Sequence, residues 1–303
     1  MGNYILSIIR KTSNNDSSDI ITYNQVKNLD LNKFPPEICF EILKNLNATD
    51  LCLAACVWRN IAYSDVLWRK LCLFKWPFIE KYDLQINNNQ ISSFFKLYLI
   101  LDESTLLFNY NCFDGIAHLK KNKIITNDKA LVDFLFHSKD LSKDQLWCFL
   151  ESNFQHLRQF IKQINYTRIY FPLGLKETFQ RISSPGLNMT YKTLELIITS
   201  FAEKYLLDNP ETGHTLDELF LLSFSLIVLY EDLNCPHVKN KMSKREFIKN
   251  TKNAVRSIDS EFLGLVYDEI YTEGLVPSSI KRKRNDLPVF NPTTVPLDMI
   301  NAS

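Results

Sequence analysis

Residues 220–250 read FLLSFSLIVLYEDLNCPHVKNKMSKREFIKN, and the pattern of this stretch decides the fold. Four apolar residues in its first part share one helical face, at the spacing of an amphipathic helix: Phe220, Phe224, Ile227 and Val228. A polar break that contains Pro236 ends this helix, and a second helical segment follows Met242. The stretch therefore predicts two helices joined by a structured break, within a larger helical unit.

The composition of the whole chain extends this prediction to an all-α fold. Glycine occurs 7 times in 303 residues, whereas an average composition would supply roughly 20. Glycine-rich phosphate loops, tight hairpins and doubly wound sheets are therefore poorly provided for. The hydrophobic share of 46% suffices for the buried cores of one large domain or two smaller ones.

Charge and cysteine content argue against several functional classes. Lys and Arg number 35 against 34 Asp and Glu, and the net charge of +1 argues against a protein that coats nucleic acid or an acidic membrane. The 7 cysteines include no C-x-x-C pair, so neither a disulfide framework nor a zinc ribbon is indicated. Because no secretory signal or run of ~20 apolar residues occurs either, we expect a cytoplasmic protein without a transmembrane segment.

The sequence offers no catalytic or cofactor-binding constellation. Its 5 histidines are scattered, without a metal-ligand pair at i, i+4 or a neighbouring nucleophile. No ATP loop of the G-x-x-x-x-G-K-[ST] type occurs. We therefore expect no cofactor, no metal and no catalytic centre. Gly2 could accept a myristoyl group, but Leu6 stands where that signal wants Ser or Thr, which favours an untethered start.

Composition and periodicity divide the chain into five segments. They are a flexible leader (1–30), a short helical unit (31–78), a connector with a bridging helix (79–104), a domain of eight to ten helices (105–274) and a disordered tail (275–303). The tail carries a Lys-Arg-Lys-Arg quartet at residues 281–284. This quartet could act as a nuclear address or contact acidic lipid, so peripheral membrane contact stays open, although a solvated tail is the simpler interpretation.

Residues 34–72 predict three short helices. Pro35 and Pro36 suit a first helical turn, and four apolar residues then share one face: Ile38, Ile42, Leu43 and Leu46. A second helix is expected over residues 51–58, with Thr49 or Asp50 as its N-cap, and a third around Trp68. Roughly forty residues bury little surface, yet this segment carries more apolar side chains than three helices can hide. The unit therefore needs a partner.

This segment resembles the F-box family. Residues 35–38, 42–43, 46, 50–51, 56–59 and 67–68 stand where the F-box pattern has its fixed positions, and Phe34 replaces the usual Leu. The resemblance implies docking on the Skp adaptor and, through it, on a cullin-type ubiquitin ligase; a helical subdomain without a ligase partner is the alternative. The residues implied in adaptor binding are Pro35, Pro36, Ile38, Ile42, Leu43, Leu46, Leu51 and Trp58.

The stretch at residues 220–250 resembles the Sec7 domain family, the exchange factors for ARF-type GTPases. In that family a polar break and a proline precede Val-Lys-Asn-Lys-Met, which stands here at residues 238–242. The resemblance implies a right-handed multi-helix domain whose apolar groove receives the two switch segments of an ARF-family GTPase. The residues implied in that groove are Phe171, Pro172, Gly174, Phe224, Ile227, Val228, Asp232, Leu233, Lys241, Met242 and Phe247.

Exchange activity in this family depends on one carboxylate, carried by a loop that reads Phe-Arg-Leu-Pro-Gly-Glu-Ala-Gln. The carboxylate repels the β-phosphate of GDP and competes for the cations that hold it, which is worth several kcal/mol at contact distance. The resemblance places this loop at residues 170–177, which read YFPLGLKE. Alignment on Pro172 puts Gly174 at the position of the acid, and Glu177 lies three residues further on. We therefore expect a ligase adaptor that binds a GTPase without exchanging its nucleotide. An ARF exchange factor and a helical scaffold with neither activity are the alternatives.

Overall fold

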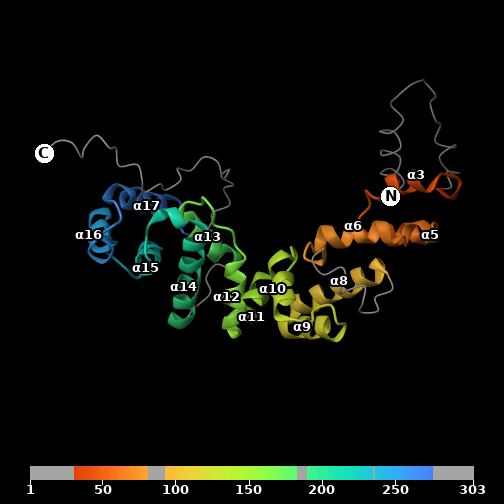
Figure 1. Ribbon diagram of the computed structural model, residues 1–303, viewed down its shortest axis with the longest axis horizontal. Coiled ribbons are helices and arrows are strands. Elements are labelled where there is room, and N and C mark those ends of the chain that lie inside the picture. The colour runs from red at the N-terminus through yellow and green to blue at the C-terminus, as the bar shows by residue number, and fades with distance from the viewer. Residues whose placement is uncertain (1–30, 81–92, 183–189, 235, 276–303) are drawn as a thin grey trace, which may run out of the picture. The chain divides into compact units, whose positions relative to one another are not determined.

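The computed structural model describes residues 31–80, 93–182, 190–234 and 236–275 (Figure 1). Every regular element within these ranges is helical, which confirms the predicted all-α fold. The expected leader, most of the expected tail, Gly2 and the basic quartet at residues 281–284 lie outside the described residues. None of the helices in the described ranges is long and apolar enough to span a bilayer.

The N-terminal helices of the described chain are short. They are η1 (Leu31–Lys33), α3 (Pro36–Leu43), α4 (Ala48–Ala55), α5 (Arg59–Ala62) and α6 (Asp65–Lys75). The predicted N-cap of the second helix is wrong, because α4 begins earlier and Asn47 caps it, accepting a 2.8 Å hydrogen bond from the Asp50 amide. The predicted end at residue 58 is also wrong, since the chain turns after Ala55 and restarts as α5.

Helix α8 (Phe94–Tyr110) completes the core that α3 to α6 begin. Trp68 of α6 is fully buried, and its ring meets the rings of Phe95 at 4.7 Å and Tyr98 at 5.2 Å in edge-on geometry. Tyr98 also contacts Trp76 at 5.1 Å. Such aromatic pairs stabilise by about 1 kcal/mol each beyond the area that they bury. Helix α8 therefore supplies part of the apolar surface that the short helices need to bury their core.

A polar cluster around Lys75 fixes α6 to α8 at the edge of this core. Lys75 Nζ donates to Asp102 Oδ1 at 2.7 Å and lies 3.2 Å from Asp140 Oδ2, with the Trp76 ring 5.0 Å away. Partial burial alone would lower the pKa of Lys75, but the hydrogen bonds to the two carboxylates outweigh it and raise this pKa above its usual value. The charged form of Lys75 is therefore part of the fold.

Helices α9 (Cys112–Lys121) and α10 (Asp128–His137) pack in the same body as α6 and α8. Gly115 of α9 touches α8 so closely that a Cβ would lie 2.5 Å from the Phe108 backbone, which only glycine permits. Contacts divide the chain into two compact units, one of residues up to 108 with 113–140, and one of residues 109–112 with those from 141 onward. The segment boundary that we expect at residue 104 or 105 falls inside α8.

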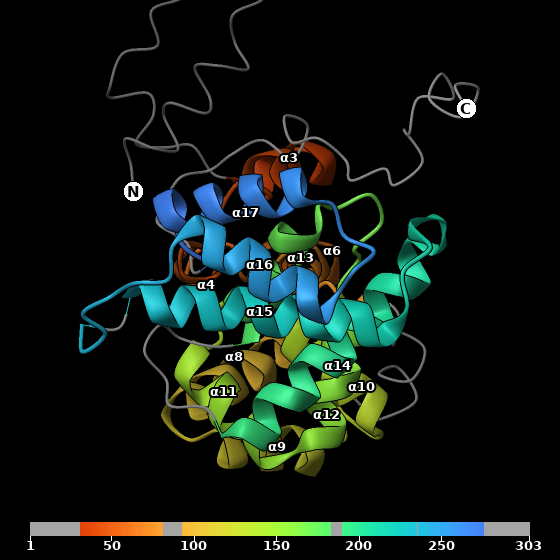
Figure 2. The same cartoon turned by 90° about the vertical axis from the view of Figure 1, so that its left-hand side faces the viewer.

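The described part of the second unit consists of helices. They are α11 (Lys143–Ser152), α12 (Phe154–Lys162), α13 (Phe171–Ile182), α14 (Tyr191–Asp208), η2 (Pro210–Thr212), α15 (Leu216–Asn234), α16 (Lys244–Ala254) and α17 (Ser260–Glu273). Among them α12 packs on α14, and α11 packs on both α12 and α13. Figure 2 shows α14, α15, α16 and α17 following one another, each packed on the next. The two helices predicted within residues 220–250 are α15 and α16.

Removal of the α8 aromatic contact should weaken the N-terminal core. We predict that Phe95→Ala lowers the free energy of unfolding of the first unit by about 2 kcal/mol, because it strips cover from Trp68. Three of the 4 tryptophans, Trp58, Trp68 and Trp76, lie in this unit, so urea unfolding followed by tryptophan fluorescence measures the change. Leu99→Ala, at a side chain 47% exposed on the same helix, is the matched control. Equal midpoints for the two variants would contradict the proposed role of α8.

Candidate functional site

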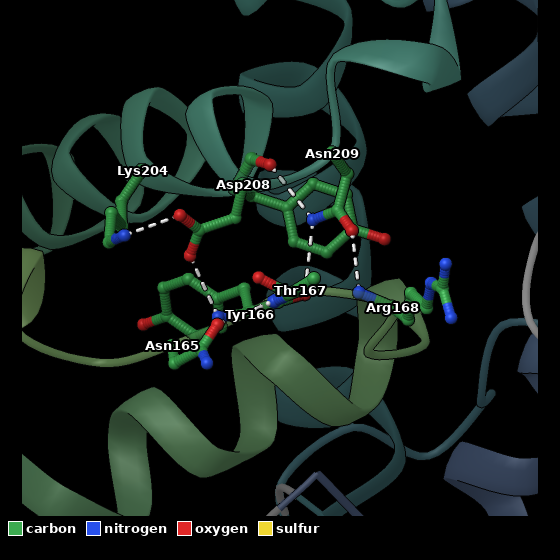
Figure 3. Close-up of polar contacts among 8 residues, drawn as sticks. Asn165, Tyr166, Thr167, Arg168, Lys204, Asp208 and Asn209 are labelled. Carbon is green, nitrogen blue, oxygen red and sulfur yellow. Dashed lines mark hydrogen bonds and ion pairs between the residues drawn. The ribbon is translucent and has the colours of Figure 1, made fainter.

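The loop that joins α12 to α13 is held by the end of α14 (Figure 3). Asp208 Oδ2 accepts a hydrogen bond from the Tyr166 amide at 2.8 Å, and Asn209 Oδ1 accepts one from the Arg168 amide at 2.8 Å. The Asn209 side-chain amide donates to the carbonyls of Tyr166 at 3.1 Å and Tyr205 at 2.9 Å. One buried asparagine therefore makes two hydrogen bonds to the loop and a third to the last turn of α14.

Further contacts fix the same loop on both sides of Arg168. The Tyr205 hydroxyl donates to the Ile169 carbonyl at 2.9 Å, and Lys204 Nζ donates to the second oxygen of Asp208. Arg168 has a left-handed backbone with φ of 56°, which costs a non-glycine residue about 1 kcal/mol or more. Its exposed side chain points away from the cluster in Figure 3. The sequence did not reveal this network, because its partners lie about 40 residues apart in the chain.

Gly174 lies inside a helix and faces the core of the second unit. The prediction of a loop over residues 170–177 is wrong, because α13 begins at Phe171 and its first turn is covered by α14 and the preceding loop. A Cβ on Gly174 would lie 3.3 Å from Tyr166 Cδ1 and 3.4 Å from Phe201 Cε2. Burial raises the pKa of the Tyr166 hydroxyl far above its usual value, despite its hydrogen bond to Thr178. The surroundings of position 174 are therefore those of a neutral core.

Neighbouring residues of α13 are also engaged within the unit. Phe171 and Pro172 are buried, and Lys176 Nζ donates to the Gly274 carbonyl at 3.1 Å. Glu177 pairs with Arg181 one turn later at 3.2 Å. Residues 163–175 contain no Asp or Glu, and Arg168 is the one charged residue among them. The segment aligned with the family's acidic loop therefore presents a cation and no acid.

The break between α15 and α16 brings together three of the predicted groove residues. Asp232 Oδ2 accepts from the Met242 amide at 2.6 Å, and Lys241 Nζ donates to the Asp232 carbonyl at 2.7 Å. The Tyr267 hydroxyl donates to the Met242 carbonyl at 2.8 Å, and a capping box between Ser243 and Glu246 starts α16. These bonds fix the backbone on both sides of Met242. Asp232 therefore has a structural role at this break.

The remaining predicted groove residues differ in exposure. Phe247 is 1% exposed and packs near Tyr267, so it belongs to the core. Val228 of α15 is 39% exposed. Four other predicted groove residues are half-buried: Phe224, Ile227 and Leu233 of α15, and Met242. Phe224, Ile227 and Val228 thus form a partly exposed apolar face of α15, and the Met242 amide is bound to Asp232 of the same helix. Phe171, Pro172 and Gly174 are packed inside.

The residues implied in adaptor binding also fall into distinct groups. Pro35, Pro36 and Ile38 are exposed at the start of α3, with Ile38 at 47%. Ile42 and Trp58 are half-buried, and three residues form the core of the short helices: Leu43, Leu46 and Leu51. The candidate residues did not include two exposed apolar side chains of this segment, Leu53 at 47% and Val57 at 68%. The sequence signal available for Leu53 and Val57 was that each is an apolar residue at a position outside the apolar face of the predicted helix.

Comparison with known proteins identifies both halves of the chain. The profile described as F-box-like matches residues 31–74, and the profile described as Sec7 domain matches residues 98–275, more than half of the chain. F-box only protein 8 of Mus musculus is 39% identical over 254 residues, which cover 82% of this chain and 78% of the mouse protein. The chain belongs to the F-box only protein 8 family. The Homo sapiens member of this family has the same identity and coverage.

Other Sec7 proteins are more distant from this member of the F-box only protein 8 family. The ADP-ribosylation factor guanine nucleotide-exchange factor sec72 of Schizosaccharomyces pombe is 32% identical over 171 residues, 54% of this chain but 9% of the yeast protein. A solved structure of ARF1-GDP bound to a Sec7 domain with Brefeldin A matches 59% of this chain and 94% of the matched chain. Its TM-score is 0.52 at 22% identity, which establishes the shared fold.

An acid introduced at position 174 should damage the fold without creating an exchange factor. We predict that Gly174→Glu lowers the free energy of unfolding by about 4 kcal/mol, because it buries an uncompensated carboxylate between Tyr166 and Phe201. Thermal unfolding followed by circular dichroism measures this loss. Thr167→Glu adds the same charge at an exposed site and should change the melting temperature little. A fully stable Gly174→Glu protein would contradict the inward orientation of this position.

Proposed function

We propose that this protein is a non-catalytic ligase adaptor, whose F-box docks on a Skp adaptor and whose Sec7 domain binds an ARF-family GTPase without releasing its nucleotide. The observation that carries the proposal is the placement of Gly174 in the core of the second unit, behind a loop that lacks any acid. We propose that it acts in the cytoplasm as a subunit of a cullin-type ubiquitin ligase.

The apolar surface on α15 supports the GTPase-binding half of the proposal. Val228 and the half-buried side chains beside it offer contact area, and Met242 next to them is flexible enough to fit a partner. The Met242 amide donates to Asp232 and the Met242 carbonyl accepts from the Tyr267 hydroxyl, and these two bonds hold the backbone of Met242 in place before any partner arrives. The solved complex of ARF1-GDP with a Sec7 domain supports a small GTPase as the partner, because this chain has the same fold.

The charge of the α12–α13 loop supports binding without exchange. Release of GDP requires an anion that is brought against the phosphate, and the one charged residue of residues 163–175 is Arg168. A cation near the nucleotide would attract the phosphate and so retain it. Glu177 supplies no substitute, because it is paired with Arg181.

Exchange on an ARF is the second candidate function. The similarity to sec72 favours it, because sec72 is an ADP-ribosylation factor guanine nucleotide-exchange factor that is 32% identical to this chain over the matched region. This function would require a carboxylate from outside residues 163–175. A GDP-release measurement distinguishes it from our proposal.

The exposed start of α3 supports the ligase half of the proposal. Pro35, Pro36 and Ile38 lie at the surface, while the core beneath them is closed by Leu43 and by the α8 aromatic residues. An apolar surface that is not needed to complete its own core is available for another protein.

Adaptor docking should depend on Ile38. We predict that Ile38→Asp reduces recovery of a purified Skp adaptor in a pull-down at least tenfold, because a charge replaces an exposed apolar contact at the centre of the interface. Its melting temperature should stay near that of the unmodified protein, since Ile38 is 47% exposed. Leu265→Asp, 60% exposed on α17, is the matched control and should leave recovery unchanged. Undiminished adaptor binding by Ile38→Asp would exclude this docking surface.

If the protein binds an ARF-family GTPase without exchanging its nucleotide, it should capture the GTPase and leave the rate of GDP release unchanged. We expect ARF loaded with a fluorescent GDP analogue to bind the full chain, and Val228→Asp to weaken that binding at least tenfold by charging the apolar surface. The rate of GDP release should stay within twofold of that of ARF alone. Acceleration comparable to that by a Sec7 exchange factor would favour the second candidate. A lack of ARF binding would exclude the GTPase half of the proposal, and together with a lack of Skp adaptor binding it would favour a helical scaffold with neither activity.

A further inference from the structure

Helix α16 and its flanks are the most basic part of the described chain. Residues 239–256 hold seven Lys or Arg residues and one acid, Glu246, although the whole chain has a net charge of +1. The excess of positive charge is therefore local. Figure 2 shows α16 between α15 and α17, and Figure 1 shows it at the edge of this group of helices.

Three of these cations form one row on the face of α16 that points away from its neighbours. Arg245, Lys249 and Lys252 follow each other at i, i+4 and i+7, the spacing of a single helical face. The opposite face carries the buried residues Phe247 and Thr251. Arg245 and Lys249 are exposed and Lys252 is half-buried, so the row spans about 10 Å along the helix.

The acids near this helix do not neutralise the row. The Glu246 carboxylate is used in the capping box, where it accepts from the Ser243 amide and hydroxyl at 2.9 and 2.7 Å. Asp268 of α17 is paired with Lys244 at 2.6 Å, on the side of α16 that faces α17. Glu261 also lies on α17, and it forms no ion pair with any cation of the row. Arg245, Lys249 and Lys252 have no carboxylate partner among the described residues.

We propose that this row, Arg245, Lys249 and Lys252, binds an anionic lipid surface. A single convex line of cations can meet a flat, negatively charged surface without a groove or a complementary backbone edge. Each Lys or Arg near such a surface adds attraction, and three acting together change the partition by about 100-fold, or roughly 3 kcal/mol. Nucleic acid fits less well, because stable binding there calls for contacts to many phosphates, and the row offers only three cations.

The row lies close to Met242, so lipid binding by α16 would affect where the predicted GTPase-binding surface is held. Helix α16 begins two residues after Met242, and Lys239 and Lys241 continue the positive charge to the break before it. A membrane contact through α16 would hold the apolar surface of α15 and Met242 close to the bilayer. The lipid contact itself does not depend on the GTPase or on the Skp adaptor, so it stands or falls separately from the proposed function.

Vesicle co-sedimentation of the full chain tests the proposal. We expect binding to vesicles of phosphatidylcholine with 30 mol% phosphatidylserine, no binding to phosphatidylcholine alone, and loss of binding as salt rises. The variant Arg245→Glu, Lys249→Glu, Lys252→Glu should bind at least 100-fold more weakly. The matched control is Lys120→Glu, Lys121→Glu, Lys129→Glu, which makes the same charge change at exposed sites of α9 and α10 and should bind as the unmodified protein does.

Several outcomes would overturn the proposal. Undiminished binding by the α16 variant would assign any membrane contact to another part of the chain, such as the basic quartet at residues 281–284. Equal loss in the control would mean that only net charge matters. Complete displacement from vesicles by a stoichiometric short DNA duplex would assign the row to nucleic acid. If the triple Glu variant melts early, Arg245→Gln, Lys249→Gln, Lys252→Gln replaces it, and a loss of about 100-fold is then expected, because all three charges are removed.

Discussion

The burial of Trp68 against α8 is the interaction on which the first unit depends. The short helices α3 to α6 bury too little surface to be stable alone, and the rings of Phe95 and Tyr98 cover the remaining side of their core. Lys75 then fixes α6 against α8 by its bond to Asp102, and its contact with Asp140 joins α6 to the segment after α10. The F-box is therefore continuous with the helix at which the Sec7 profile begins, and its exposed residues are left free for another protein.

In the second unit a buried asparagine has the corresponding role. Asn209 satisfies two carbonyls and one amide of a loop and a helix end that would otherwise be buried without partners, each at a cost of about 1–3 kcal/mol. This network holds Tyr166, and Tyr166 together with Phe201 leaves little room for a side chain at position 174, since a Cβ there would lie 3.3 Å from one ring and 3.4 Å from the other. The lack of an acid there is thus a property of the packing as well as of the sequence.

Local patterns in the sequence predicted the fold class and much of the helix layout. The low glycine content indicated the all-α fold correctly. The apolar spacing of residues 220–228 predicted α15, and the helix expected around Trp68 is α6. Features that depend on distant residues were missed: Asn209 lies 41 residues from Arg168, and Lys75 lies 27 residues from Asp102. The loop expected at residues 170–177 failed for the same reason, because burial of Phe171 against Tyr205 favours a helix.

A net charge near zero conceals how the charges of this chain are distributed. Helix α17 carries acids and no Lys or Arg, whereas α16 beside it carries four cations and one acid. The Lys244–Asp268 ion pair joins the two helices, so one cation of α16 and one acid of α17 neutralise each other. Since exposed pairs of this kind contribute about 1 kcal/mol or less, the segregation is not needed for stability. Its physical effect is to give adjacent surfaces opposite sign, so that a charged partner meets this unit in one orientation.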